Sequence, residues 1–325
     1  MATWLADIQG RTFPSMKVVL DMDPGIDDAI TLLLALNNPA VHVLAVTTVS
    51  GNVNVSKATL NALRVIEASG KYSPPVYKGA ARPLNKRLHP IHAESVHGTD
   101  GLGISNLPAP QLIGPQKTKA VDKLLELIST HKRGDISIVA TGPLTNIAML
   151  LQKEPSAANK LNKIFVMGGI YDNGLTNGNV TKYAEFNFYC DPEAAQIVMD
   201  SSHKKKPLTV VASGLDVTNS LECAVEKNAL ELICSIRTKI SDIACRILQY
   251  PVHTFSYFNL YDVFALFSLV HPQIFKMDRC SVRVCSRLQK FRGRCTVACG
   301  RKGNVLICKE VNHTKFNEIL FDGLK

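Results

Sequence analysis

Four aspartates lie within eight positions near the start of the chain: Asp21, Asp23, Asp27 and Asp28. Carboxylates this close repel one another, and burying several of them without a counter-charge costs more than a fold tolerates. A hard divalent cation such as Ca²⁺ or Mg²⁺ relieves the repulsion, because it takes carboxylate, carbonyl and water oxygens as ligands. The preference of acidic residues for a helix N-terminus is a simpler explanation, but it accounts for one or two aspartates and not for four. The cluster therefore predicts a metal site.

Apolar runs on both sides of the aspartates predict the elements that position them. Residues 18–20 predict a short buried strand, Pro24-Gly25 a turn, and residues 29–36 an apolar helix. The carboxylates therefore lie where a strand is followed by a helix. In an α/β sheet this junction forms the crevice outside the carboxyl ends of the strands, where ligands bind.

Strand patterns alternate with helix patterns through most of the chain. The further predicted strands are 41–48, 74–77, 136–140, 164–167 and 208–212. This alternation predicts an α/β fold with a mainly parallel, twisted sheet flanked by helices. Beyond about residue 278 the pattern becomes β-rich, with Gly293 and Gly303 at expected turns, which predicts a small antiparallel β appendage at the C-terminal end. We expect an N-terminal extension at 1–16 and a single domain at 17–325.

Polar residues or glycines follow the predicted strands. They are Asp21 and Asp23, Asn52, Thr141, Gly168-Gly169 and Asp216. Because the carboxyl ends of parallel strands lie side by side, we expect these residues to form one site. Such a site is rich in oxygen and poor in cysteine and histidine, which suits Ca²⁺ or Mg²⁺ better than zinc. A long irregular stretch at 79–112 is expected to be functional as well.

Motifs for a nucleotide cofactor or a serine nucleophile are absent from the sequence. It has no Gly-x-x-x-x-Gly-Lys-Ser/Thr loop, no Gly-x-Gly-x-x-Gly fingerprint and no Gly-x-Ser-x-Gly elbow. The remaining chemistry combines a metal held by carboxylates, a further carboxylate that acts as a base, and water as the nucleophile.

The composition limits the partners of the protein. The net charge is +10, and basic residues gather at 204–206 and 279–302. A nucleic-acid-binding protein normally adds a recognisable module or aromatic residues among the basic ones. Aromatic residues make up only 6% of the chain and no module is present, so we expect a solvated basic face and no nucleic-acid partner. No apolar run approaches the ~18 residues of a membrane span, so no membrane partner is expected.

The nine cysteines, an odd number, include no Cys-x-x-Cys pair. This spacing favours free thiols in a reducing compartment over a disulfide framework or a zinc site. Residues 1–16 lack the charged start and apolar core of a secretory signal, so we expect a cytoplasmic protein.

Six motifs, in order along the chain, resemble those of the nucleoside hydrolases, enzymes that cleave the N-glycosidic bond of ribonucleosides. They are residues 21–28, 50–52, 97–103, 140–146, 166–169, and 184–187 continuing into 191–195. The resemblance covers about residues 17–270 and implies a Rossmann-like nucleoside hydrolase fold. It also implies that the substrate is a small-molecule ribonucleoside, a purine one such as inosine or guanosine, cleaved to ribose and free base in nucleoside salvage. Relatives are dimers or tetramers, which implies a homodimer or homotetramer.

The resemblance also implies roles for single residues. It implies a Ca²⁺ ion held by Asp23, Asp28, the Thr141 carbonyl and Asp262, with Asp27 as the general base that takes a proton from the metal-bound water. The implied ribose-binding residues are Asn52, Met167, Asn179, Glu185 and Asn187, with His97 near the 5′ end of the sugar. Cleavage produces an oxocarbenium-like ribose, and anionic and carbonyl groups around the sugar stabilise its developing charge.

Simpler explanations exist for some of these residues. Asn179 and Asn187 could order a loop, because asparagine is common in turns. Met167 could fill the core, and His97 could lie on a mobile surface loop.

Tyr261 departs from the pattern of many purine-cleaving relatives, which carry His-Asp where this chain has Tyr261-Asp262. The histidine thought to protonate the departing base is therefore absent. A tyrosine, with a pKa of about 10, keeps its proton at neutral pH and is a weaker acid than imidazolium. Tyr261 can donate a hydrogen bond to the base or stack on it, or His253, Tyr250 or Tyr257 can replace it. A catalytically impaired protein that binds nucleosides or ribose and keeps the metal site is the alternative function.

Overall fold

A single large sheet runs through the centre of the fold. The computed structural model describes residues 15–201, 208–300, 303 and 305–325, and within them this sheet has nine strands in the order β10-β9-β11-β6-β5-β4-β1-β2-β3. The strands are β1 (Met16–Met22), β2 (Val41–Thr48), β3 (Val76–Lys78), β4 (Ile136–Ala140), β5 (Lys163–Met167), β6 (Thr209–Ser213), β9 (Phe275–Val284), β10 (Cys295–Cys299) and β11 (Val305–Val311). All neighbours from β3 to β11 are parallel. The predicted mainly parallel α/β sheet is confirmed.

The C-terminal strands are antiparallel, as the sequence predicts, and they extend the main sheet. β9 pairs antiparallel with both β11 and β10. β11 pairs in parallel with β6, with Val305 opposite Val210 and Ile307 opposite Ala212. The antiparallel part is therefore hydrogen-bonded to one edge of the parallel sheet. A separate two-stranded sheet joins β7 (Val225–Glu226) to β8 (Tyr257–Phe258).

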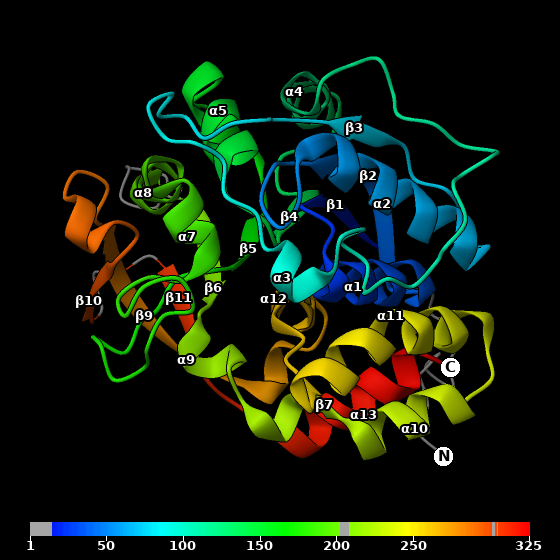
Figure 1. Cartoon of the computed structure of the whole chain (residues 1–325). Helices are drawn as coiled ribbons and strands as arrows, with labels where there is room; N and C mark the ends of the chain where they lie inside the picture. Colours follow the sequence, from blue (N-terminus) through cyan, green and yellow to red (C-terminus); the bar gives the residue numbers. More distant parts are fainter. Residues whose placement is uncertain (1–14, 202–207, 301–302, 304) are drawn as a thin grey trace, which may run out of the picture.

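Helices cover both faces of the large sheet (Figure 1). One face packs against α4 (Ala120–Thr130), α5 (Thr145–Lys153) and α8 (Pro192–Ser201). The other packs against α1 (Ile26–Asn37), α2 (Val55–Ser69) and α12 (Tyr261–Val270). The helices α11 (Lys239–Phe255) and α13 (His313–Gly323) pack on α1, and α10 (Lys227–Ser235) packs on α11. Strand side chains alternate between the two faces. The β1 residues Val18 and Leu20 therefore belong to one apolar core and Val19 to the other.

The helices α1 and α12 are the most deeply buried. Every residue from Ile26 to Leu36 and from Asp262 to Ser268 is buried. A helix that is apolar on all sides is stable only when protein surrounds it, and these two pack against each other and against the sheet. This packing fixes where their first turns lie, and those turns carry Asp27, Asp28 and Asp262.

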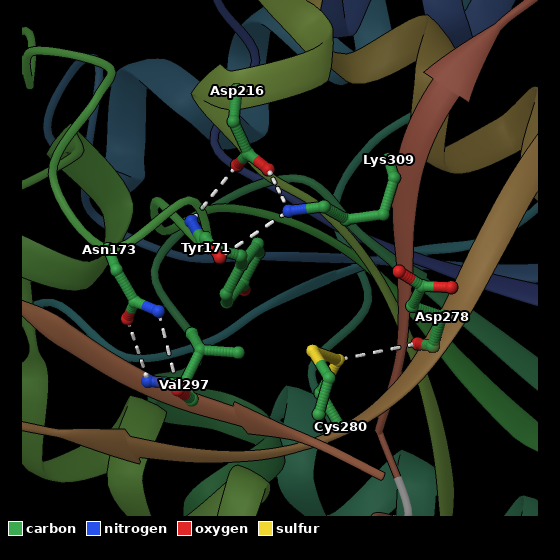
Figure 2. The surroundings of a disulfide bond; sticks show 8 residues. Tyr171, Asn173, Asp216, Asp278, Cys280, Val297 and Lys309 are labelled. Carbon is green, nitrogen blue, oxygen red and sulfur yellow. Dashed lines mark hydrogen bonds and ion pairs between the residues drawn. A yellow bond between two sulfur atoms is a disulfide. The ribbon is translucent and has the colours of Figure 1, made fainter.

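Two disulfides contradict the expectation of free thiols. One joins Cys234 to Cys245, between α10 and α11, and the other joins Cys280 to Cys299. The second forms because the antiparallel register of β9 and β10 places these two cysteines opposite each other (Figure 2). Spacing along the chain cannot reveal either pair, since both depend on packing. The thiol argument for a reducing compartment therefore fails, and the cytoplasmic location stays a prediction.

Some expected features fall outside the described residues or stay untested. Residues 1–14 of the expected N-terminal extension and the basic triplet 204–206 lie outside, and the domain limits 1–16 and 17–325 stay a prediction. Within the described part of the chain, no helix combines the length and apolar character that crossing a membrane requires.

Candidate functional site

The carboxylates of Asp23 and Asp28 are fully buried at the junction of β1 and α1, where hydrogen-bond donors hold them. Asp28 Oδ2 accepts hydrogen bonds from Gly25 N at 3.0 Å and from Asn52 Nδ2 at 3.1 Å. Asp28 Oδ1 accepts one from Thr141 Oγ1 at 2.6 Å. Asp23 Oδ2 accepts one from Asn52 N at 2.6 Å. Residues that follow three parallel strands thus meet at one point, as expected for their carboxyl ends.

The helix α12 adds a further carboxylate, that of Asp262. Side-chain oxygens of Asp27, Asp28 and Asp262 lie within 4.8 Å of one another. All three occupy the first turn of their helices. The N-terminal end of a helix carries partial positive charge, so both helices partly offset the cost of gathering these acidic groups.

Asp23, Asp27, Asp28 and Asp262 together form the acidic cluster. Burial raises the pKa of each of these four carboxyl groups above its ordinary value. Loss of solvent is the largest cause for Asp23, Asp27, Asp28 and Asp262. Repulsion between the carboxylates adds to the raised pKa of Asp23, Asp27 and Asp262. A bound cation would favour the ionised forms and so lower these pKa values.

Two oxygens of the cluster, Asp23 Oδ1 and Asp27 Oδ1, are buried and have no hydrogen-bond partner. Leaving a buried acceptor unpaired costs about 1–3 kcal/mol. Glycines allow close approach to Asp23: a Cβ atom on Gly142 would lie 2.7 Å from its Oδ1, and one on Gly51 would collide with its Oδ2. Unpaired carboxylate oxygens, with no cysteine or histidine among the donors, suit a hard divalent cation. The residues present therefore fit a metal ion.

A cavity of about 450 Å³ adjoins the cluster. It is lined by every residue to which the resemblance assigns a role except Asp23 and Asp28, namely Asp27, Asn52, His97, Thr141, Met167, Asn179, Glu185, Asn187, Tyr261 and Asp262. Asp23 and Asp28 lie behind the wall, since both are hydrogen-bonded to Asn52. The structure thus brings together the residues that the motifs single out.

Glu185 and Asn187 come from the start of the short helix α7 (Phe186–Cys190). Glu185 Oε1 accepts a hydrogen bond from Asn187 N at 2.7 Å, and its Oε2 accepts from Phe188 N at 3.0 Å and Gly169 N at 2.9 Å. Burial raises the pKa of Glu185 to about 7, against the lowering effect of these three bonds. The carboxylate therefore caps the helix as well as facing the cavity.

Asn187 joins α7 to the ends of two strands. Its Nδ2 donates to Thr141 O at 2.7 Å and to Met167 O at 3.2 Å. Because a carbonyl oxygen has two lone pairs, Thr141 O keeps one for another partner. Met167 is buried and lines the cavity, so it is both core and wall. Asn179 is exposed and lines the cavity from the segment before α7.

His97 is buried and therefore does not lie on the surface. Its Nδ1 accepts a hydrogen bond from Ile26 N at 3.0 Å, which satisfies one of the free backbone donors at the start of α1. Burial lowers the pKa of His97 to about 4, so the ring is neutral at neutral pH. With Nδ1 acting as acceptor, the ring proton is on Nε2, which remains a donor.

Tyr261 lines the cavity, whereas its possible replacements Tyr250, His253 and Tyr257 do not. Burial raises the pKa of Tyr261, so the phenol keeps its proton. Asn259 Nδ2 donates to Tyr261 Oη at 3.4 Å. The hydroxyl proton is therefore left for another acceptor.

Asp21 and Asp216, which were expected in the site because they follow strands, are not in the cavity wall either. Asp21 Oδ1 accepts hydrogen bonds from Thr47 Oγ1 at 2.5 Å and Asn146 Nδ2 at 2.8 Å, and burial raises its pKa to about 6. Asp216 accepts from Tyr171 N at 3.0 Å and pairs with Lys309 at 3.5 Å. Asp21 and Asp216 thus lie at the carboxyl ends of the strands, as predicted, but away from the cavity. Their position in the sequence after a strand does not distinguish these two places.

Some residues of the cavity wall were not predicted from the sequence. Ile91, His92 and Val96 come from the long irregular stretch 79–112, which was expected to be functional without any single residue being identified. Phe258, on β8, also lines the cavity. An apolar side chain next to a polar motif has no sequence signal that separates cavity wall from core.

Known proteins resemble this chain over nearly its whole length. A family model described as inosine-uridine preferring nucleoside hydrolase matches residues 18–318. "Probable uridine nucleosidase 2" of Oryza sativa subsp. japonica is 37% identical over 274 residues, which cover 82% of this chain and 78% of that protein. "Pyrimidine-specific ribonucleoside hydrolase RihA" of Escherichia coli O1:K1 / APEC is 34% identical over 322 residues, covering 96% and 99%.

Solved structures show the same likeness. A plant nucleoside hydrolase, PpNRh1, matches with a TM-score of 0.87 at 29% identity, over 96% of this chain and 99% of that one. An inosine-guanosine nucleoside hydrolase matches with a TM-score of 0.84 at 25% identity, over 95% and 98%.

The acidic cluster predicts that a divalent cation stabilises the fold. A ligand that binds only the folded state at about 100 times its dissociation constant adds about 2.7 kcal/mol, which raises Tm by roughly 4 °C in a protein of this size. We expect that rise in scanning calorimetry when CaCl₂ or MgCl₂ is added to chelator-treated protein. Asp262→Asn should lose most of it, and the exposed control Asp122→Asn should keep it. An equal Tm with and without either cation would contradict the metal site.

Proposed function

The chain belongs to the inosine-uridine preferring nucleoside hydrolase family, and on that premise we propose that it hydrolyses the N-glycosidic bond of ribonucleosides to ribose and free base with Ca²⁺ at the acidic cluster. The observation that carries the proposal is the unpaired Asp27 carboxylate at the wall of a cavity lined by amide, carbonyl and carboxylate groups. A sugar with several hydroxyl groups offers donors and acceptors to such a wall. Self-association as a homodimer or homotetramer stays a prediction.

Asp27 is the general base of the proposed reaction. Bound Ca²⁺ would be held by Asp23, Asp28, Asp262 and the Thr141 carbonyl, and it would supply positive charge that acidifies water and orients sugar hydroxyls. Asp27 lines the cavity, and no hydrogen bond engages its Oδ1, so its carboxylate is available to take the proton of the attacking water. Proton transfer to this carboxylate makes the water nucleophilic.

Other residues of the cavity wall bind the ribose in this proposal. The groups involved are Asn52, Met167, Asn179, Glu185 and Asn187, with His97 Nε2–H as the donor to the 5′ hydroxyl. Cleavage builds positive charge on the sugar ring, and the nearby carboxylates of Glu185 and the acidic cluster stabilise it. Because the hydrogen bonds of Glu185 and Asn187 to the backbone already fix both side chains, little ordering is needed when the substrate binds.

Tyr261 activates the leaving base in this proposal. The departing base gains electrons as the bond breaks, and a hydrogen bond from the tyrosine hydroxyl stabilises that charge without full proton transfer. This assistance suits uracil, whose negative charge spreads onto its carbonyl oxygens, better than a purine that leaves after protonation of its ring. The relatives named as a uridine nucleosidase and a pyrimidine-specific hydrolase support the same choice.

We therefore put uridine first among the substrates. The purine preference expected from the sequence remains the second candidate, favoured by the likeness to the inosine-guanosine hydrolase structure. A nucleoside- or ribose-binding protein without turnover remains the alternative function.

Ribose release from uridine, cytidine, inosine, guanosine and adenosine tests the proposal directly. We expect release by the wild-type protein, fastest from uridine. Asp27→Asn should lower kcat by about 10²–10⁴-fold, the contribution of a general base, while Tm in the presence of calcium stays close to that of the wild type. Wild-type turnover in Asp27→Asn would refute its role as base. Binding of the nucleosides without release by the wild type would establish the binding-protein alternative.

Tyr261→Phe tests the activation of the base. It removes only the hydroxyl group, so the ring still fills its place in the wall. We expect kcat for uridine to fall by about 10–10²-fold, the effect of one lost hydrogen bond to a charged group. A nucleoside analogue with a good leaving group, such as p-nitrophenyl riboside, needs no such assistance and should be cleaved nearly as fast as by the wild type. Equal loss on both substrates would assign Tyr261 to sugar binding.

A further inference from the structure

The hairpin of β9 and β10, with its turn at 285–294, contains most of the late basic stretch that the proposed reaction does not use. It lies beside α7 and α8 in the structure (Figure 1). The segment 171–190 crosses this region and carries Asn179, Glu185 and Asn187 of the cavity wall. The contacts between the hairpin and this segment indicate what the basic residues do.

Arg292 is the central contact. Although it is an arginine, only 8% of it is exposed. Its Nη2 donates to Cys190 O, at the C-terminal end of α7, at 3.2 Å. Its guanidinium carbon lies 4.2 Å from the centre of the Tyr189 ring. A cation at a helix C-terminus and over an aromatic face is favourable on both counts.

The residues next to Arg292 tighten the same contact. Gly293 has a φ of +78°, and a Cβ atom there would lie 2.9 Å from Tyr189 N. The hairpin backbone therefore packs directly against α7. Before Glu185 in the chain, the hairpin turn contacts Tyr183. The centres of the Phe291 and Tyr183 rings are 5.2 Å apart, and the guanidinium carbon of Arg294 lies 5.4 Å from the centre of the Tyr183 ring. The hairpin turn thus contacts the chain both before and after Glu185.

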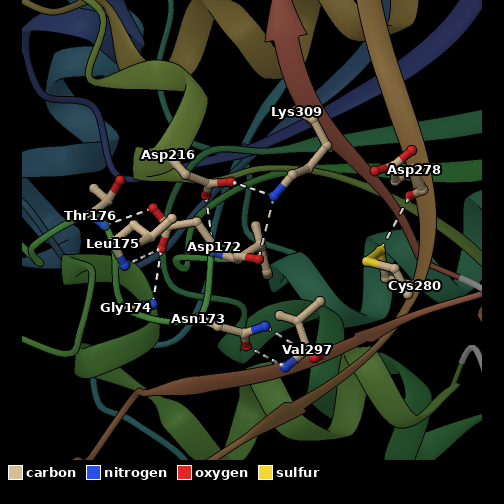
Figure 3. Close-up of polar contacts among 12 residues, drawn as sticks. Asp172, Asn173, Gly174, Leu175, Thr176, Asp216, Asp278, Cys280, Val297 and Lys309 are labelled. Carbon is tan, nitrogen blue, oxygen red and sulfur yellow. Dashed lines mark hydrogen bonds and ion pairs between the residues drawn. A yellow bond between two sulfur atoms is a disulfide. The ribbon is translucent and has the colours of Figure 1, made fainter.

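A second attachment holds the start of the segment. The Asn173 side chain donates to Val297 O at 3.5 Å and accepts from Val297 N at 3.3 Å, and Asp172 closes the following turn by accepting from the backbone of residues 174–176 (Figure 3). Lys309 of β11 donates to Tyr171 O at 3.5 Å (Figure 2). The strands β10 and β11 therefore hold the start of the segment, and the hairpin turn holds its end.

We propose that the β9–β10 hairpin positions the ribose-binding wall and that Arg292 is the positioning residue. The inference rests on the proposed function in its choice of ribose as the bound group. The five-residue helix α7 is too short to be stable alone. Glu185 caps its first turn, and Arg292 binds its last carbonyl. Without Arg292, α7 loosens at its C-terminal end and Asn187 loses its fixed bond to Thr141 O.

The test compares Arg292→Ala and Arg292→Lys with Arg287→Ala, an exposed arginine of the same turn. For the best nucleoside substrate, we expect Arg292→Ala to raise KM about tenfold with a smaller change in kcat, because the lost contact positions the sugar. Arg292→Lys, which keeps the charge without the flat stacking group, should be intermediate. Arg287→Ala should stay within about twofold of the wild type.

Hydrogen exchange supplies a readout that needs no substrate. In Arg292→Ala the amides of residues 186–191 should exchange about tenfold faster, while those of α5, at 145–153, stay unchanged. If Arg292→Ala does not fold, KM and hydrogen exchange of Arg292→Lys test the proposal instead. KM and exchange within about twofold of the wild type, or a uniform rise in exchange across the chain, would overturn the proposal. If the wild type releases no ribose, the proposed function fails, and exchange alone still decides whether Arg292 positions α7.

Discussion

The burial of four carboxylates at one edge of the sheet is the constraint on which the structure of the site depends. Asp23, Asp27, Asp28 and Asp262 lose solvent together, and each pKa rises. Nearby donors pair with some of their oxygens, while Asp23 Oδ1 and Asp27 Oδ1 remain unpaired. Such an arrangement is stable only when positive charge compensates it, and the N-terminal ends of two helices supply only part of that charge. A cation supplies the rest in our account.

The apolar parts of the fold explain why the carboxylates cannot move apart. The helices α1 and α12 are buried on all sides, so withdrawing either first turn from the cluster would expose apolar surface. The same rigidity extends to the cavity wall. Asn187 is hydrogen-bonded to the Thr141 carbonyl, and Asn52 to Asp23 and Asp28. The proposed metal site and the proposed ribose site therefore share their supporting bonds.

The sequence predicted the elements and site residues best where the interacting residues are close along the chain or follow strands with a clear pattern. The strands 41–48 and 136–140 have the predicted limits. Asp23, Asp27 and Asp28 were identified from their crowding, whereas Asp262 was identified only from the family resemblance. Prediction failed where packing between elements distant in the sequence determines which residues lie next to each other. The register that pairs Cys280 with Cys299, and the position of Asp216 beside Lys309, have no local signal. The burial of Arg292 against α7 is of the same kind, since arginine is ordinarily exposed.

Bound calcium and ribose release, measured in the same samples through a titration with a calcium chelator, test the central claim most directly. We expect about one calcium per chain in the fully active protein. Ribose release should fall in proportion to the calcium removed and return when calcium is restored. Full release from protein that has lost its calcium and contains no other divalent metal would contradict the central claim.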